Sequence, residues 1–344
     1  MTTDHDSWHF VLWVRMFAGE ALVNVFCTSR HGLHFSVSPI ASSIALKWLV
    51  DHCPRLRHLT LFPTDPTADE HPDGENILLH FLYEKPFQSY LNCLQELREL
   101  TCTSAVLEGE GLKTLGQLPF LERLIVYSGR MSPAVRSAYE ELSDDLFSSL
   151  RYLRWTSDGP DSSIDWTDGL RVMLRKVTTC ELEINDCDSA ATWTSGKFFP
   201  IIPCAPFLET FSVEYNPHCA CSTYRLADLS RLIPFGQLSL QSVSFSKMRI
   251  PLKGPEASKI LGSAWSKVTY LNLSSTIASL GDLLAFVHLP RLEHLVIHLV
   301  ITVDGIPEGN VEPDFGLSLH TLEASPNSSA PSSIHWRQVR SISR

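Results

Sequence analysis

The chain has 344 residues, of which 44% are hydrophobic, and this length allows one elongated domain or two compact ones, each with a large core. Its formal net charge is −10 at pH 7. That balance argues against a general role in binding nucleic acid or an anionic membrane, because both require a basic surface.

The N-terminal segment predicts two short strands with a helix between them. Apolar residues alternate in SWHFVLWVR (7–15) and in SRHGLHFSVS (29–38), which indicates strands. The intervening AGEALVNVFCTSR (18–30) predicts a helix. Arg15 and Glu20 interrupt the apolar run here, so we do not expect it to span a membrane.

From residue 56 onward, one apolar pattern recurs along the chain. Its form is L-x-x-L-x-L, as in LERLIV (121–126), and consecutive copies from residue 97 onward begin 24 to 32 residues apart. The alternation at its end places two side chains on one face of a strand. The segments that precede the copies, such as IALKWLVDHCP (44–54) and EASKILGSAW (256–265), have helical spacing. The copies begin at Leu56, Leu97, Leu121, Leu150, Val177, Leu208, Leu240, Val268, Leu292 and Leu319.

A repeat of this length cannot bury its apolar face alone, so neighbouring repeats are expected to stack. We therefore predict a single α/β solenoid over residues 1–325, curved, with a parallel sheet on its concave side and helices or irregular returns on its convex side. The alternative is a doubly wound α/β domain, but its strands would be more uniformly apolar. The glycines of GEGLKTLG (109–116) also open no fitting phosphate-binding turn between a strand and a helix.

Three segments depart from the repeat. PTDPTADEHPDGEN (63–76) is acidic and rich in proline, which predicts a solvated insertion. TSDGPDSSIDWTDG (156–169) is acidic, and a solvated loop is one interpretation of it. The alternatives are a cation site, although the spacing of its acidic residues differs from that of an EF-hand, and an acidic lip for a basic partner. Residues 326–344 form a Ser/Pro-rich tail that we expect to be disordered.

The segments that begin the strands resemble those of leucine-rich repeat proteins, and more narrowly those of fungal F-box proteins. The resemblance covers roughly residues 8–325 and rests on DHCPRLRHLTL (51–61), FSSLRYLRW (147–155), SAWSKVTYLNL (263–273) and HLPRLEHLVI (288–297). It implies a solenoid that recognises proteins, and in the F-box subclass the substrate-recognition part of an SCF-type ubiquitin ligase.

In that subclass an F-box docks on the Skp1 adaptor, and no such segment precedes Trp8 here. We therefore expect a Skp1-type adaptor as a partner only if an F-box exists outside this chain. A fragmentary gene model and a true variant are both compatible with this start. The alternative role is that of a truncated or degenerate repeat protein, structural and without a ubiquitin-ligase link.

Residues that flank the inward apolar positions are expected on the concave face, where a protein partner would bind. Two adjacent strands contribute tyrosine and arginine, types that are over-represented in binding hot spots. Neighbouring repeats contribute carboxylates that can select a partner's Lys or Arg. Polar residues that merely fill an exposed face are the alternative interpretation. The candidate partner-binding residues are Arg123, Ile125, Tyr127, Tyr152, Arg154, Glu181, Glu183, Glu214, Tyr270 and His294.

The sequence contains no recognisable catalytic, cofactor or metal signature. His294 and His298 lie four residues apart on a predicted strand, roughly 13 Å, and cannot share one zinc ion. The cluster HCAC (218–221) lacks a second pair at zinc-finger spacing. We therefore expect no enzymatic activity, no cofactor and no metal. The nine cysteines lack regular spacing, and Cys102 and Cys180 stand where leucine would otherwise occur, which predicts free thiols and an intracellular protein, cytoplasmic or nuclear.

Overall fold

A computed structural model of the chain divides it into two compact units, Met1–Val177 and Thr178–Arg344. The residues that the structure describes are 10–15, 22–29, 32–37, 47, 50–51, 55–63, 85–107, 110–128, 143, 145–157, 167–184, 198–215, 224–226, 228–252, 256–279, 281–286, 288–300 and 319–324.

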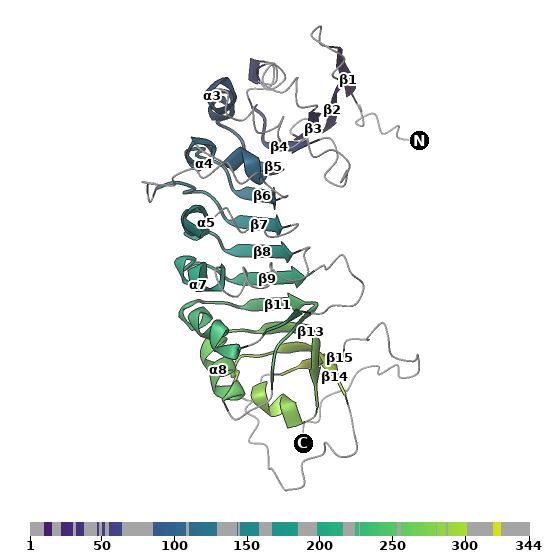
Figure 1. The fold of residues 1–344 in the computed structure, drawn as a ribbon, viewed down its shortest axis with the longest axis vertical. Helices are drawn as coiled ribbons and strands as arrows, with labels where there is room; N and C mark the ends of the chain where they lie inside the picture. Colours follow the sequence, from purple (N-terminus) through teal and green to yellow (C-terminus); the bar gives the residue numbers. More distant parts are fainter. Residues whose placement is uncertain are drawn as a thin grey trace, which may run out of the picture. The chain divides into compact units, whose positions relative to one another are not determined.

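The first unit contains one sheet whose strands lie side by side in chain order (Figure 1). The first two pairings are antiparallel, and β3 to β7 are parallel. The strands are β1 (Phe10–Arg15), β2 (Leu22–Ser29), β3 (Gly32–Val37), β4 (His58–Pro63), β5 (Glu99–Thr103), β6 (Arg123–Ser128) and β7 (Tyr152–Ser157). The helices α3 (Lys85–Cys93), η1 (Ser104–Leu107) and α4 (Glu110–Gly116) lie between these strands along the chain, and α5 (Thr167–Leu174) follows β7.

The helix predicted over residues 18–30 is wrong, because β2 is a strand there. The segment LVNVFCTS is rich in β-branched and aromatic residues, which favour extended backbone. Pairing with β1 on one side and β3 on the other satisfies its backbone hydrogen-bonding groups, and this tertiary gain overrides a weak helical pattern. The strands predicted in 7–15 and 29–38 are confirmed as β1 and β3.

Among the described residues of the second unit, six parallel strands again follow the chain order. They are β8 (Thr179–Ile184), β9 (Thr210–Tyr215), β11 (Ser242–Ser246), β13 (Tyr270–Ala278), β14 (His294–Leu299) and β15 (Thr321–Ala324). A separate parallel pair is formed by β10 (Tyr224–Arg225) and β12 (Met248–Arg249). The helices are α7 (Phe199–Ile201), η3 (Ile202–Cys204), η4 (Leu229–Gln237), α8 (Ala257–Ala264) and η5 (Gly281–Phe286).

One backbone contact repeats from strand to strand and sets their register. The carbonyl of Arg98 accepts hydrogen bonds from the N–H groups of Glu122 and Arg123, at 2.8 and 2.9 Å. In the second unit the carbonyl of Thr178 does the same for Glu209 and Thr210, at 2.9 and 3.0 Å. Equivalent positions of successive repeats therefore lie side by side.

The inward positions of the predicted triplets are buried, as Leu124 and Val126 of β6 illustrate with no exposed area. Strand order that follows chain order excludes the doubly wound alternative, in which the order reverses. The fold is therefore an α/β leucine-rich repeat solenoid, as predicted. Its curvature, and the union of residues 1–325 in one domain, stay predictions.

The segments predicted to depart from the repeat fall mostly outside the described residues. Of the predicted insertion 63–76, Pro63 ends β4 and the rest lies outside. Of the acidic loop 156–169, the first two residues belong to β7, the last three begin α5, and 158–166 lie outside. The predicted tail 326–344 lies outside as well.

A buried position three residues before seven of the described triplets was not predicted from the sequence; before the Leu240 triplet it is the exposed Gln237. The N–H of Leu97 donates to the carbonyl of Leu94, and that of Leu150 donates to Phe147, which closes a tight turn into the strand. The repeat is therefore longer than the predicted pattern and includes the turn itself. The residues at this position are Leu94, Leu118, Phe147, Leu174, Ala205, Trp265 and Leu289, all buried.

The core of the second unit contains a cluster of aromatic rings. Phe211 of β9 lies at its centre and has no exposed area. Its ring centroid lies 5.3 Å from that of Phe235 in η4 and 6.1 Å from that of Phe245 in β11. Phe198 and Phe199 each lie 6.3 Å from it. The cluster thus joins adjacent strands to the helices that cover them.

Candidate functional site

Five predicted site residues lie together on the face of the sheet that points away from the core in the first unit. The register of β6 and β7 places Arg123 opposite Tyr152 and Ile125 opposite Arg154, and Tyr127 follows on β6. All five side chains are partly exposed, while the residues that alternate with them are buried. We call these five residues the open-face patch.

Arg123 is held between two side chains on neighbouring strands. Its guanidinium carbon lies 3.6 Å from the ring centroid of Tyr152, which is a cation–π contact. On the other side, its Nε lies 3.7 Å from Oε1 of Glu99, which is opposite Arg123 in the register of β5 and β6. Glu99, Arg123 and Tyr152 therefore form a row across three strands.

The ion pair between Arg123 and Glu99 is weak, although the strand register places the two residues opposite each other. The side chains of Arg123 and Glu99 are 42% and 35% exposed, and an exposed pair contributes about 0–1 kcal/mol. The separation of 3.7 Å is longer than a charge-assisted hydrogen bond. The Nε atom of Arg123 is buried and has no hydrogen-bond partner among the described residues.

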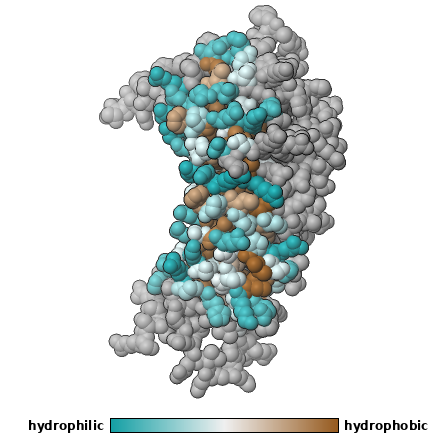
Figure 2. All heavy atoms as spheres, turned by 90° about the vertical axis from the view of Figure 1, so that its left-hand side faces the viewer, coloured by the Kyte–Doolittle hydropathy of each residue, from teal (hydrophilic) through white to brown (hydrophobic). Residues whose placement is uncertain are grey.

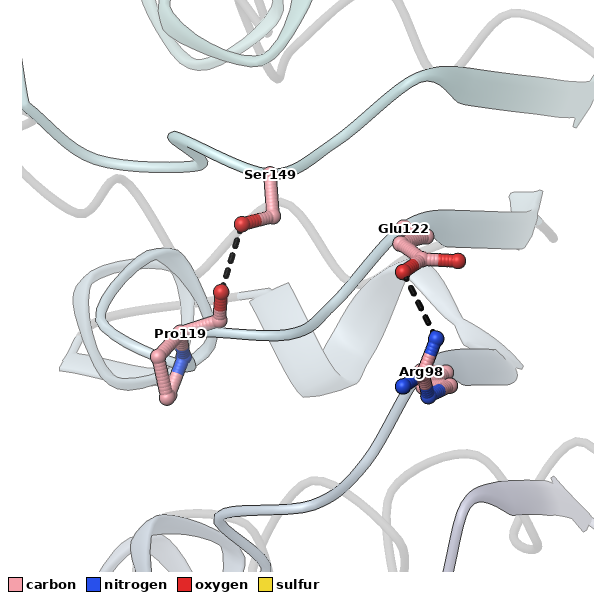
Figure 3. A network of polar contacts seen from close by, with 4 residues as sticks. All are labelled: Arg98, Pro119, Glu122 and Ser149. Carbon is pink, nitrogen blue, oxygen red and sulfur yellow. Dashed lines mark hydrogen bonds and ion pairs between the residues drawn. The ribbon is translucent and has the colours of Figure 1, made fainter.

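Polar contacts just before the strands hold this part of the sheet in register (Figure 3). Arg98 Nη1 donates to Glu122 Oε1 at 3.0 Å, and the two residues occupy the same position in consecutive repeats. The hydroxyl of Ser149 donates to the carbonyl of Pro119 one repeat earlier. These contacts precede β6 and β7 directly, so they help to fix where the open-face patch is presented.

The other five predicted site residues belong to the second unit. Glu181 and Glu183 project from β8, and Glu214 on β9 lies directly opposite Glu183. Like charges in that arrangement are destabilising. That these carboxylates adjoin the open-face patch stays a prediction.

Tyr270 and His294 are brought together on β13 and β14. They are opposite in the register, and their ring centroids are 5.0 Å apart. Nε2 of His294 lies 3.2 Å from Oε1 of Glu323 on β15. Neither Glu323 nor, in the first unit, Glu99 was among the predicted site residues. Glu99 lies opposite Arg123, so a comparison of the same position in adjacent repeats would have found it. Glu323 lies opposite Val296, and the residue opposite His294 is Thr321, so the same comparison would not have found Glu323.

Two predicted free thiols are buried inside the sheet. Cys102 on β5 and Cys180 on β8 have no exposed area and form no disulfide. Desolvation raises the pKa of each thiol well above its usual range, and for Cys180 the neighbouring Glu181 adds to this effect. Both thiols therefore stay protonated near neutral pH and are poor nucleophiles.

Within the described residues, no group of three His, Cys, Asp or Glu side chains is arranged to hold a metal ion. The HCAC cluster at 218–221 lies outside the described residues. No helix in the described part of the chain has the length and apolar character needed to cross a membrane.

Hydrophobic side chains also reach the surface near the helices. Phe120 and Phe207 occupy the same position in their repeats, just before a triplet, and are 50% and 52% exposed. Ile233 of η4 is 53% exposed. Figure 2 shows the helix side of the molecule, where hydrophobic residues form separate groups among hydrophilic ones. Scattered hydrophobic exposure of this kind is normal for a protein surface and does not indicate a binding site.

No protein-family model matches the chain, and no curated protein matches it. Among solved structures, it is similar to an internalin from Listeria monocytogenes, with 17% identity, a TM-score of 0.36, and coverage of 80% of this chain and 76% of that one. A protein from Bacteroides fragilis matches with 8% identity, a TM-score of 0.39, and coverage of 85% and 73%. These similarities are low, and the fold assignment rests on the strand order and register of the chain itself.

Proposed function

We propose that this chain is a protein-recognition module without enzymatic activity, and that it binds a protein partner through the open-face patch. The row of Glu99, Arg123 and Tyr152 supports this proposal most directly. Arginine and tyrosine are enriched at binding hot spots, and strands present them more rigidly than loops do. Ile125 adds an apolar surface beside them.

The resemblance of the strand-forming segments to fungal F-box proteins supports a narrower role. In that role the chain is the substrate-recognition part of an SCF-type ubiquitin ligase. A Skp1-type adaptor would then bind an F-box located outside this chain, and the open-face patch would bind the substrate.

Charge reversal in the patch tests the broader proposal. We expect Arg123→Glu combined with Arg154→Glu to reduce partner capture strongly, because both changes invert the charge of the binding surface. The melting temperature is expected to change little, since the residues are partly exposed. Captured proteins are compared by quantitative mass spectrometry for the wild type and the variant.

The control carries the same change in net charge away from the patch. Arg231→Glu combined with Arg291→Glu alters two exposed residues of the second unit. Equal capture by both double variants and the wild type would refute a role for the patch. Co-purification of Skp1 with the full-length gene product would support the ubiquitin-ligase role. If Skp1 is consistently absent, that role is excluded and protein recognition is the role that remains.

A further inference from the structure

We propose that the partner presents a carboxylate, from an Asp or Glu side chain in a segment that also carries apolar residues, to the guanidinium of Arg123. This inference rests on the proposed function and specifies the chemistry of the partner.

The orientation of Arg123 is set before any partner arrives. Tyr152 supports one face of the guanidinium at 3.6 Å, and Glu99 contacts its Nε edge at 3.7 Å. Fixing a long side chain in advance removes part of the entropy cost that binding would otherwise carry. Arg123 is thus preorganised on a strand held by neighbours on both sides.

The hydrogen-bonding capacity of Arg123 is not used by the described residues. A guanidinium has five N–H donors, and Arg123 donates a hydrogen bond to none of the described residues. Its Nε is buried while the side chain as a whole is 42% exposed, so the exposed area lies away from Nε. A carboxylate is the group that matches this fork of donors, because its two oxygens accept parallel hydrogen bonds.

The charges around Arg123 favour an acidic partner over a basic one. The outward positions described on β5 to β7 carry two arginines, Arg123 and Arg154, and one carboxylate, Glu99. The formal charges at these described positions therefore sum to +1, although the chain as a whole carries −10. A basic segment would meet the charge of Arg123, which disfavours it.

The apolar part of the partner is inferred from the side chains beside the arginines. Ile125 lies between Arg123 and Tyr127 on the same face of β6 and is opposite Arg154. Ile125 and Tyr127 are both partly buried, so they offer apolar contact area next to the charged groups. The preferred ligand is therefore an acidic residue flanked by aliphatic or aromatic ones.

A purely structural role for Arg123 makes a different prediction. The cation–π contact and the exposed ion pair would each contribute no more than about 1 kcal/mol to stability. Arg123→Gln should therefore remain folded, which makes it a usable variant for binding experiments. A structural role would leave ligand selection unchanged.

The test is a selection of random dodecapeptides displayed on phage against the whole chain. We expect the selected peptides to be enriched in Asp or Glu next to apolar residues. A synthetic peptide from this selection should bind Arg123→Gln about 10- to 100-fold more weakly than the wild type. Replacing its acidic residue with the matching amide should cause a similar loss, and the two changes together should be less than additive.

Arg55→Gln is the matched control, because Arg55 is also an exposed arginine of the first unit but precedes β4, outside the open-face patch and the contacts that position it. Peptides without acidic enrichment, peptides rich in lysine, or equal binding by Arg123→Gln and Arg55→Gln would overturn the inference alone. Because displayed peptides carry no phosphate, a site specific for phosphate would also give no acidic enrichment. If substitution of Ile125 or Tyr127 weakens the binding of none of the selected peptides, the proposed function is overturned as well.

Discussion

Replacing Phe211 with alanine is expected to lower the free energy of unfolding of the second unit by about 3–5 kcal/mol. The ring has no exposed area and packs against four other phenylalanines from α7, η4, β11 and the residue before α7. Its removal leaves a cavity that rigid strands cannot close. Urea unfolding followed by far-UV circular dichroism measures the loss as a lower midpoint for the affected transition.

Phe207→Ala is the matched control, since it removes the same ring four residues earlier, where the side chain is 52% exposed. We expect this variant to change the free energy of unfolding by less than about 0.5 kcal/mol. Similar destabilisation by the two variants would show that Phe211 is not at the centre of the aromatic cluster.

Gly111→Ala is expected to destabilise the first unit by about 1–3 kcal/mol or more. A Cβ atom at this position of α4 would lie only 2.0 Å from the carbonyl oxygen of Val106 in η1. Because the obstacle is backbone, relief requires that α4 and η1 move apart. The variant should show a lower melting temperature, measured by differential scanning calorimetry.

Gly281→Ala provides the control for this substitution. A Cβ atom there would meet only the hydroxyl oxygen of Ser279, at 3.7 Å, which is an ordinary contact. We expect the melting temperature to stay within a few degrees of the wild type. If both glycine variants melt alike, the close approach of α4 to η1 is wrong.

Much of the fold could be predicted because the apolar pattern reflects how each repeat is buried. In every copy the side chains at the triplet positions need a neighbouring repeat to cover them, so the spacing alone indicates parallel strands in chain order. Two glycines of GEGLKTLG, Gly111 and Gly116, have a structural explanation. A Cβ atom at Gly111 would meet a backbone carbonyl, and one at Gly116 would meet the side chain of Leu146.

The misassigned segment at β2 shows what the pattern omits. Residues 22–29 are short and apolar, and such a segment suits a helix or a strand according to what lies beside it. Only the pairing with β1 and β3 decides between them. The buried turn position three residues before seven of the triplets was missed for a related reason, since leucine, phenylalanine, alanine and tryptophan all occur there.

The candidate site was predicted in part. Register follows from the repeat, so the proximity of Arg123 to Tyr152 could be inferred from sequence. The stacking of the guanidinium on the ring, and its approach to Glu99, depend on side-chain rotamers that a repeat pattern does not specify.

The register of β6 and β7 is the central claim, and engineered disulfides test it most directly. Ile125→Cys and Arg154→Cys are combined in a background where every cysteine except the buried Cys102 and Cys180 is serine, and free thiols are counted after mild oxidation. Residues opposite each other in adjacent strands are about 5 Å apart, within the range that a disulfide spans. The account predicts that this pair oxidises readily and that Ile125→Cys with Tyr152→Cys, about 7–8 Å apart on the diagonal, does not. Preferential oxidation of the diagonal pair, or of neither pair, would contradict it.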